Sequence, residues 1–503
     1  MEAATEWLLE NTPITKSECT TIRESVVDGD TGGYGVFVNF TKLRTLKGEK
    51  DSKFELLRIP RSATISMTSI RDILAKSTSE NAVTASIKGH LTAFLSDENH
   101  HAFINETNLI VIYLVLKAIL SDNKTYKLTG FASFYLNEVL LKTFVPLPCN
   151  TFQEDADKWN QYYKEYLNFP QQLFIEIINR FISARFLGMN YEKLISTVYC
   201  SVISRILEIP ESSGEDTDDF FVSPTLVPLL DFVNHDNDHR NAHFDIDLRT
   251  NDIVLYLELD DIDSTVEEAQ VFISYAPVEE LVHFEQIYGF LPKSNNVQVW
   301  CYRFDEDFLS TYHYNGINVS HFYKCMRVRP SFQILILPSE VLINDCIVEF
   351  GELLILFSQH LQDPKKISFQ LSETNDSYCS ILKDKCGTET TKLLDKEECL
   401  EEFFGEHDEI ENYEKTLKEF KSFLSKYITF RREKISSINL LSQNSSFTAF
   451  WQKEINLLDS LKGQFESKKE VMWYEKYGND EKIKIPTVPF PPPSWIDYEN
   501  MRV

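Results

Sequence analysis

The chain has 503 residues, of which 43% are hydrophobic and 25% charged, and its formal net charge at pH 7 is −27. This length suffices for two or three hydrophobic cores of ordinary size. The negative charge argues against general binding to a nucleic-acid backbone, which needs a basic surface that releases counterions, and it favours basic protein partners.

The cysteines and the apolar segments bear on the cellular compartment. The nine cysteines form no CxC or CxxC pair and their number is odd, so we expect reduced thiols and no structural zinc. Residues 1–10 lack the features of a signal peptide, and no run reaches the roughly 18 apolar residues that span a bilayer. We therefore expect a soluble monomer in the cytoplasm, with the nucleus as a second compartment, and no membrane or direct nucleic-acid contact.

The first part of the chain combines a short helix with strands. Residues 3–10 have the apolar spacing of a helix, which Pro13 ends. Alternation in residues 26–40 predicts a strand, a turn at residues 28–33 and a second strand, and residues 54–66 predict a further strand. Short strands joined by glycine turns favour a small, irregular β fold.

Helices then interrupt the strands. Apolar content predicts helices over residues 109–120, 131–141, 161–167, 171–186 and 191–207. Strand patterns return at residues 227–234, 243–247, 253–259 and 271–275. Further on, residues 410–430 and 450–474 repeat apolar residues at helical intervals, and prolines in residues 485–495 predict an extended tail.

Three short strings stand next to predicted strands. The first is Gly32-Gly33-Tyr34-Gly35, which alone indicates only a hairpin turn. The second is Asn234-His235, preceded by Pro228-Leu229-Leu230-Asp231-Phe232. The third consists of Ile273-Ser274-Tyr275 and, after twelve intervening residues, Tyr288-Gly289-Phe290. Each string is weak evidence alone, but their combination is specific.

Together the strings resemble the split active site of SET-domain lysine methyltransferases. The resemblance is closest to the branch typified by the Rubisco large-subunit methyltransferase, which includes fungal enzymes that methylate ribosomal proteins. It implies an α+β fold, in which a SET-type irregular β fold with a pseudoknot is interrupted by an α-helical insertion and followed by a mainly α-helical C-terminal domain. The implied parts are an N-terminal SET part (1–85), the insertion (86–222), a C-terminal SET part with the active site (223–293), a helical substrate-binding domain (294–484) and a proline-rich tail (485–503).

The resemblance also implies which residues bind the methyl donor, S-adenosylmethionine. Asn234 and the backbone of His235 would contact its amino-acid and adenine ends. The glycine string, through Gly33, Tyr34 and Gly35, would line its methionine portion. Arg205 would pair with the donor's carboxylate, although an ion pair within the protein is an equal alternative.

By the same resemblance, Tyr288 is the catalytic tyrosine and also binds the donor, and Tyr275 provides a second catalytic hydroxyl. The lysine channel would be lined by Phe232, Ile273, Tyr275 and Phe290. A lysine amine with an ordinary pKa near 10.4 must lose its proton before it attacks, at a cost of roughly 4 to 5 kcal/mol at pH 7. An aromatic, dehydrated channel lowers that pKa, and neutral tyrosine hydroxyls orient the nitrogen lone pair without adding an anion. In an ordinary core, the same tyrosines would only pack.

The chain departs from the family pattern in one loop. The family usually has a glycine after the first tyrosine and a small polar residue with asparagine soon after, whereas this chain reads Tyr275-Ala276-Pro277-Val278-Glu279-Glu280. Glu268 also stands near the place of a usual glycine. A catalytically inactive SET-fold binding module therefore stays an alternative. A metal site is a weaker one, since its candidate ligands already fit the methyltransferase pattern: His235, Asp236, Asp238, His239 and His243.

We therefore expect a protein-lysine N-methyltransferase that uses S-adenosylmethionine, holds no metal, and acts on a basic protein. The first choice of substrate is a ribosomal or translation-related protein, by family analogy and by the acidic charge. Histones and cytochrome-type proteins are the alternatives.

Overall fold

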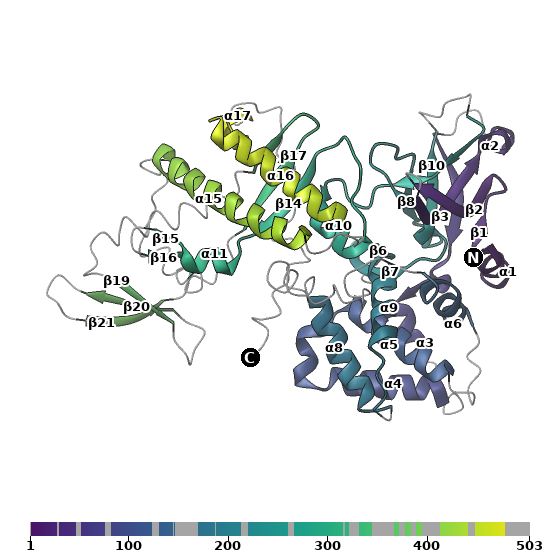
Figure 1. The fold of residues 1–503 in the computed structure, drawn as a ribbon. Helices are drawn as coiled ribbons and strands as arrows, with labels where there is room; N and C mark the ends of the chain where they lie inside the picture. Colours follow the sequence, from purple (N-terminus) through teal and green to yellow (C-terminus); the bar gives the residue numbers. More distant parts are fainter. Residues whose placement is uncertain are drawn as a thin grey trace.

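The structure is a computed structural model (Figure 1). It describes residues 2–27, 30–46, 52–75, 82–122, 130–143, 145, 170–186, 188–212, 220–259, 266–314, 317–320, 331–344, 367–371, 378–383, 389–394, 413–440 and 448–477. Helices and sheets are mixed, and Figure 1 shows strands near the N-terminus, a helical cluster below them and two long helices in the C-terminal part.

Three sheets near the N-terminus join strands that are distant in the sequence. The first has the order β11 (Glu268–Gln270), β3 (Asp30–Asn39), β2 (Thr20–Val27), and the second has the order β1 (Thr15–Lys16), β4 (Lys53–Ile59), β10 (Asp252–Glu258), β9 (Ala242–Asp247). The third places β7 (Phe220–Leu226) between β5 (Ile65–Ser66) and β6 (Ile206–Ser212). Two helices accompany them, α1 (Glu2–Asn11) and α2 (Phe40–Leu46). Strands therefore precede and follow the helical segment in the sequence and pair with one another across it.

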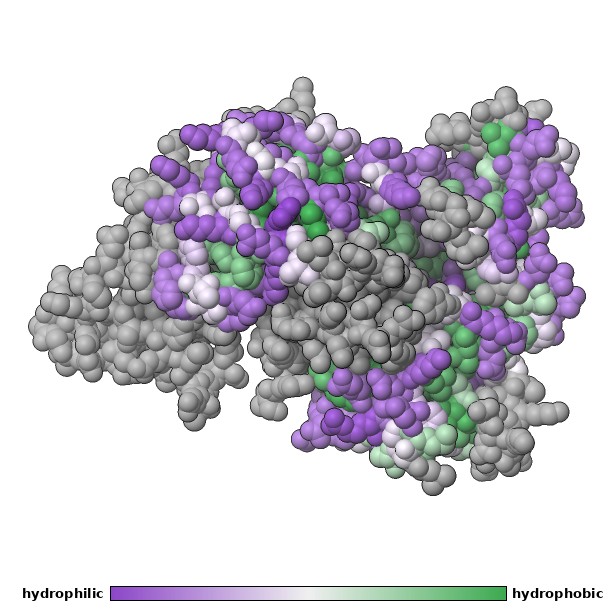
Figure 2. Space-filling model, in the orientation of Figure 1, coloured by the Kyte–Doolittle hydropathy of each residue, from purple (hydrophilic) through white to green (hydrophobic). Residues whose placement is uncertain are grey.

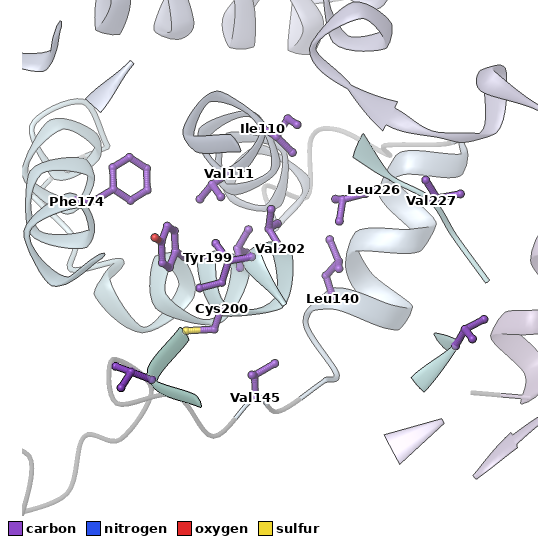
Figure 3. Packing of buried hydrophobic residues seen from close by; sticks show 14 of the residues in the cluster. Ile110, Val111, Leu140, Val145, Phe174, Tyr199, Cys200, Val202, Leu226 and Val227 are labelled. Carbon is purple, nitrogen blue, oxygen red and sulfur yellow. The ribbon is translucent and has the colours of Figure 1, made fainter. Parts of the chain in front are cut away.

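Helix α5 (Glu106–Asp122) lies at the centre of the helical cluster. Its residues 110–116 are at most 1% exposed, as expected for a helix that is apolar on all sides. Figure 3 shows Val111 of α5 near Tyr199 and Val202, with Phe174 from a second neighbouring helix. The surrounding elements are α3 (Met67–Ala75), α4 (Ala82–Leu95), η2 (Glu98–Phe103), α6 (Phe131–Tyr135), η3 (Leu136–Leu140), α8 (Pro170–Ser183) and α9 (Glu192–Ile203).

The C-terminal part combines a sheet with long helices. The sheet has the order β13 (Glu279–Glu280), β14 (Gln298–Arg303), β17 (Ser331–Ile336), β18 (Val341–Ile343). Helices α15 (Tyr413–Leu440) and α16 (Thr448–Glu466) run side by side (Figure 1). The other elements are α10 (Leu281–Tyr288), α11 (Glu306–Thr311), β15 (His313–Tyr314), β16 (Ile317–Asn318), α17 (Trp473–Tyr477) and a sheet of β19 (Ile367–Leu371), β20 (Tyr378–Lys383) and β21 (Glu389–Leu394).

Hydrophilic residues cover most of the described surface on the face seen in Figure 2, and hydrophobic residues form separate small areas there. Within the described ranges, no helix combines the length and the apolar character needed to cross a bilayer.

The main correction concerns residues 227–234, which do not form the single strand that their apolar pattern predicts. β7 ends at Leu226, Pro228 has no N–H for a strand ladder, and Leu229 has a φ of 69°. The chain therefore turns through the 3-10 segment η5 (Leu230–Phe232) and enters the two-residue strand β8 (Asn234–His235).

Several boundaries also differ from the predictions. The helix predicted over residues 191–207 ends at Ile203, because Ile206 and the residues after it pair with β7. β3 begins at Asp30, inside the predicted turn, and the strand predicted at 271–275 is only β12 (Phe272–Ile273). Short apolar runs fit a strand or a helix equally well, so pattern alone does not place such ends.

The remaining differences concern the helical regions. Helix α3 of the helical cluster begins at Met67, N-terminal to residue 86, where the insertion was expected to begin. The helix predicted over 450–474 is divided into α16 and α17. Residues 294–484, expected to be mainly helical, also contain the strands β14 to β21. The predicted helix at 161–167 and the proline-rich tail lie outside the described residues.

Candidate active site

Two short parallel strands bring the second and third strings together. β8 and β12 pair so that Asn234 lies opposite Phe272 and His235 lies opposite Ile273. The pairing continues past the strands, because the N–H of Asp236 donates to the Ile273 carbonyl at 3.2 Å. Ile273 is 3% exposed, so this junction lies inside the core.

The glycine string lies against the Asn-His strand. The Nδ2 of Asn234 donates to the Tyr34 carbonyl at 3.2 Å, and the ring centroids of Tyr34 and Phe232 are 5.9 Å apart. Gly33 has a φ of 76°, which favours glycine. A Cβ at Gly35 would lie 2.8 Å from the side-chain amide nitrogen of Gln270 in β11, so a larger residue here would force that side chain to move.

Arg205 pairs with a carboxylate of the protein. Its Nη1 lies 3.2 Å from Oδ2 of Asp231, whose side chain is fully buried, and Tyr135 donates its hydroxyl to the same oxygen. Burial raises the pKa of Asp231, and Arg205 opposes that rise. The guanidinium lies 5.5 Å from the ring centroid of Phe232, and its Nε is buried with no hydrogen-bond partner among the described residues. The ion pair between Arg205 and Asp231 is therefore present, and Arg205 Nε can still donate to a further acceptor.

An aromatic cluster packs beside His235. The ring centroids of Tyr275 and Tyr288 are 4.8 Å apart, and that of Phe284 lies 4.8 Å from His235 and 5.2 Å from Tyr288. Phe290 lies 6.1 Å from Tyr288 and is 38% exposed. The cluster therefore extends from a buried imidazole to the protein surface.

The two tyrosine hydroxyls have different surroundings. The Tyr275 hydroxyl donates to the Val233 carbonyl at 2.8 Å, whereas the Tyr288 hydroxyl has no hydrogen-bond partner within the described part of the chain. Burial, with a smaller effect of Glu208, raises the pKa of Tyr288 to about 12. Burial also raises the pKa of Tyr275. Both hydroxyls are therefore neutral at physiological pH.

Helix α10 fixes the position of Tyr288. At its start, the Glu280 carboxylate accepts the backbone N–H groups of Val282 and His283. At its end, Gly289 has a φ of 74° and donates its N–H to carbonyls one turn back. Glu280 belongs to the loop that departs from the family pattern, and it provides the N-cap of this helix.

Comparison with known proteins identifies the family. Residues 1–497 match the family described as "Cytochrome c lysine N-methyltransferase 1". The chain belongs to this family. A relative of that name from Eremothecium gossypii is 35% identical over 358 residues, which is 70% of this chain and 73% of the relative. Another from Saccharomyces cerevisiae is 26% identical over an alignment of 545 residues, covering 95% and 89%, and one from Candida glabrata is 30% identical over 351 residues, covering 66% and 62%.

Membership of the cytochrome c lysine N-methyltransferase 1 family confirms the predicted enzyme class: the chain is a protein-lysine N-methyltransferase. The inactive binding module therefore has no support from these relatives. All three are named for cytochrome c, so they do not support the ribosomal first choice of substrate, and they agree with the cytochrome-type alternative.

Sequence reasoning missed two residues beside His235. Phe284 lies in the aromatic cluster, and the Glu279 carboxylate lies 3.0 Å from the His235 Nε2. Acidic residues just before an apolar helix indicate an N-cap, so the pattern could have identified Glu280. Nothing in the sequence marks Glu279 as buried, since glutamates are mostly exposed.

The residues considered as metal ligands have separate partners. His239 lies 2.9 Å from Asp236, and His243 lies 3.1 Å from Glu258. In the part of the chain that the structure describes, no three His, Cys, Asp or Glu side chains are arranged to hold a metal ion. The alternative of a metal site at these residues has no geometric support.

Glu285 of α10 leads to a prediction about pH. Its side chain is 5% exposed, and burial raises its pKa from 4.5 to about 8. The folded state therefore binds the proton more tightly than the unfolded chain, and the free energy of unfolding falls as pH rises from 4.5 to about 8, by at most about 5 kcal/mol. Glu285→Gln stays neutral at every pH. At a pH well above 8, this variant should therefore have a higher thermal unfolding midpoint than wild type, and at low pH the two midpoints should be nearly equal.

Thermal unfolding followed by circular dichroism at alkaline and acidic pH would measure this difference. Glu466→Gln, at an exposed position at the end of α16, is the matched control for the loss of one charge. Equal midpoints for wild type and Glu285→Gln at alkaline pH would show that the carboxyl is not destabilised by burial.

Proposed function

We propose that the chain transfers a methyl group from S-adenosylmethionine to the ε-amine of a lysine in cytochrome c, within a SET-type fold that contains a pseudoknot. Family membership and the names of the relatives support this reaction and this substrate. The observation that carries the proposal is the meeting of Asn234-His235 with Tyr275 and Tyr288 in one aromatic cluster. The pairing of β8 with the later strand β12 supports the pseudoknot.

The residues present fit a methyl donor with an amino-acid end. Arg205 has a buried, unpartnered Nε beside the Phe232 ring, which suits a carboxylate. A Cβ at Gly33 would meet nothing within 4 Å, so space is open beside the glycine string. Arg205 and Asn234 would hold the amino-acid end, with the backbone of His235 nearby. When bound, the donor supplies an electrophilic methyl carbon, and a neutral amine must approach it in line.

The two tyrosines suit the handling of that amine. The proton of Tyr275 is committed to the Val233 carbonyl, so its oxygen offers only lone pairs and can accept an N–H of the amine. The hydroxyl of Tyr288 can contact the same nitrogen and turn its lone pair toward the methyl carbon. The raised pKa of Tyr288 shows that its surroundings disfavour charge, and the same surroundings favour loss of the lysine proton.

The pH dependence of the rate follows from these pKa shifts. The turnover number should rise between about pH 7 and pH 9, because the fraction of neutral lysine rises toward its ordinary pKa near 10.4. Ionisation of Tyr288 should cause no decline below its pKa of about 12. Initial rates with saturating substrate across this range measure the profile. A decline between pH 8 and 9 in protein that remains folded would contradict neutral, buried tyrosines.

The substrate is tested by direct methylation. The purified chain is incubated with isotopically labelled S-adenosylmethionine in three parallel reactions, which contain cytochrome c, core histones or ribosomal proteins. Label should enter cytochrome c at the highest kcat/KM, and replacing the modified lysine by arginine should abolish it. Because the enzyme carries a net charge of −27, the KM for a basic substrate should rise with ionic strength. Faster labelling of histones or ribosomal proteins would contradict the proposed substrate.

A further inference from the structure

We propose that Glu279 is a positioning residue of this enzyme, which acts through the His235 side chain on the peptide that carries Tyr275. This role rests on the proposed methyl transfer and adds a residue to it. Glu279 stands in the loop that departs from the family pattern, and its side chain and that of His235 are each 1% exposed.

The geometry around His235 fixes its tautomer. The backbone N–H of Tyr275 donates to His235 Nδ1 at 3.0 Å, so Nδ1 carries a lone pair and no proton. The ring proton of the neutral imidazole therefore lies on Nε2, which donates to Glu279 Oε1 at 3.0 Å. Removing that acceptor would leave a buried N–H unpaired, so the imidazole would lose the partner that fixes its orientation toward the Tyr275 N–H.

Glu279 is itself held by several donors. Asn237 Nδ2 donates to Oε1 at 3.0 Å and to the Ala276 carbonyl at 3.0 Å. Gln298 Nε2 donates to Oε2 at 2.7 Å, and Glu279 and Gln298 are partners in the β13–β14 pair. A buried carboxylate with this many donors is well satisfied, so its position is well defined.

The network therefore connects the two halves of the site. It joins β8, which carries His235, to the loop from Tyr275 to Glu279, and through Gln298 it reaches β14 of the C-terminal sheet. The ring centroid of Tyr275 lies 4.8 Å from that of Tyr288. A shift of the Tyr275 peptide therefore moves the Tyr275 hydroxyl relative to the Tyr288 hydroxyl. The backbone of His235, by contrast, is held by the β8–β12 pairing, which does not involve Glu279. Loss of Glu279 should thus affect turnover more than donor binding.

The first test is Glu279→Met, which keeps the side-chain volume and removes both acceptors. The turnover number with cytochrome c should fall by about 10²-fold, the loss expected when a reacting group is displaced by about 1 Å. The dissociation constant for S-adenosylmethionine, measured by calorimetry below the unfolding midpoint, should change by less than about threefold. Unchanged turnover, or an equal loss of donor binding, would overturn the positioning role.

Glu279→Gln is the conservative rescue. Its amide oxygen can face His235 and Asn237. Its amide nitrogen can donate to Gln298 after a flip of the Gln298 side-chain amide, which gives up the 2.9 Å bond from Gln298 Nε2 to the Pro292 carbonyl, a contact remote from His235. Turnover should therefore stay within about fivefold of wild type, since the acceptor for His235 is retained. If folded Glu279→Gln loses as much turnover as Glu279→Met, the acceptor is not what matters and the role is refuted. Glu258→Gln removes the charge from the exposed His243–Glu258 pair and should leave turnover unchanged.

A spectroscopic measurement needs neither substrate nor a variant that folds. In the donor-free wild-type protein labelled with nitrogen-15 histidine, the His235 Nδ1 signal should have the shift of a lone-pair nitrogen and Nε2 that of a protonated one. A protonated Nδ1 would overturn the inference even if cytochrome c is methylated. Conversely, failure of the wild-type protein to methylate cytochrome c would refute the proposed function and leave this tautomer intact.

Discussion

Tyr288→Phe should lower the turnover number by about 10²-fold or more, while the dissociation constant for S-adenosylmethionine changes by less than about threefold. The substitution removes one hydroxyl, which has no hydrogen-bond partner within the described residues, and keeps the ring that packs against Tyr275 and Phe284. The folded structure therefore loses little, whereas the amine loses the group that orients its lone pair.

The measurement combines calorimetric titration of the donor with single-turnover methylation of cytochrome c. Tyr256→Phe, in β10 of the four-stranded sheet, is the matched control and should keep full activity. If Tyr288→Phe retained the wild-type single-turnover rate, Tyr288 would not be the catalytic tyrosine. If it lost donor affinity in proportion to rate, its hydroxyl would belong to donor binding.

Arg431→Met should destabilise the protein by about 3 to 5 kcal/mol, because it removes one partner of a buried ionic cluster. Arg431 of α15 is 0% exposed and contacts Asp305 at 3.2 Å and Glu454 of α16 at 2.9 Å. Burial alone would raise the pKa of Asp305, but Arg431 and Lys434 hold it below its ordinary value. Without Arg431, two buried carboxylates would face each other with one cation fewer.

The neighbouring position provides the control for this cluster. Arg432 pairs with Asp459 at 2.8 Å, and the two side chains are 39% and 44% exposed, so Arg432→Met should cost about 1 kcal/mol or less. Denaturant unfolding of both variants at neutral pH gives the comparison. Similar losses for Arg431→Met and Arg432→Met would show that the buried cluster does not hold α15 and α16 in place.

Pattern reasoning succeeded where burial leaves a direct trace in the sequence. The all-apolar run of α5 predicted a buried helix, and the alternation in β9 and β10 predicted strands of nearly the observed length. The three strings led to residues that the structure brings together. Asn234 contacts Tyr34, its neighbour His235 accepts the Tyr275 N–H, and the Tyr275 ring packs against Tyr288.

Pattern reasoning failed where long-range pairing decides the local structure. The apolar residues 227–233 resemble a strand, but a proline without an N–H and a leucine with φ of 69° turn the chain there. β14 was not predicted because its partner β17 is distant in the sequence. Glu279 and Arg431 were missed for the same reason, since a charged residue is buried only when distant partners satisfy it.

Methylation of cytochrome c by this protein can be measured from the mass of cytochrome c in cells that make or lack it. Cytochrome c from cells with the protein should carry methyl-mass increments on lysine, and these should disappear when the gene is disrupted. Wild-type protein should restore them, and Tyr288→Phe, expressed at the same level, should not. Unchanged methylation of cytochrome c in the disrupted cells would show that this protein does not methylate it.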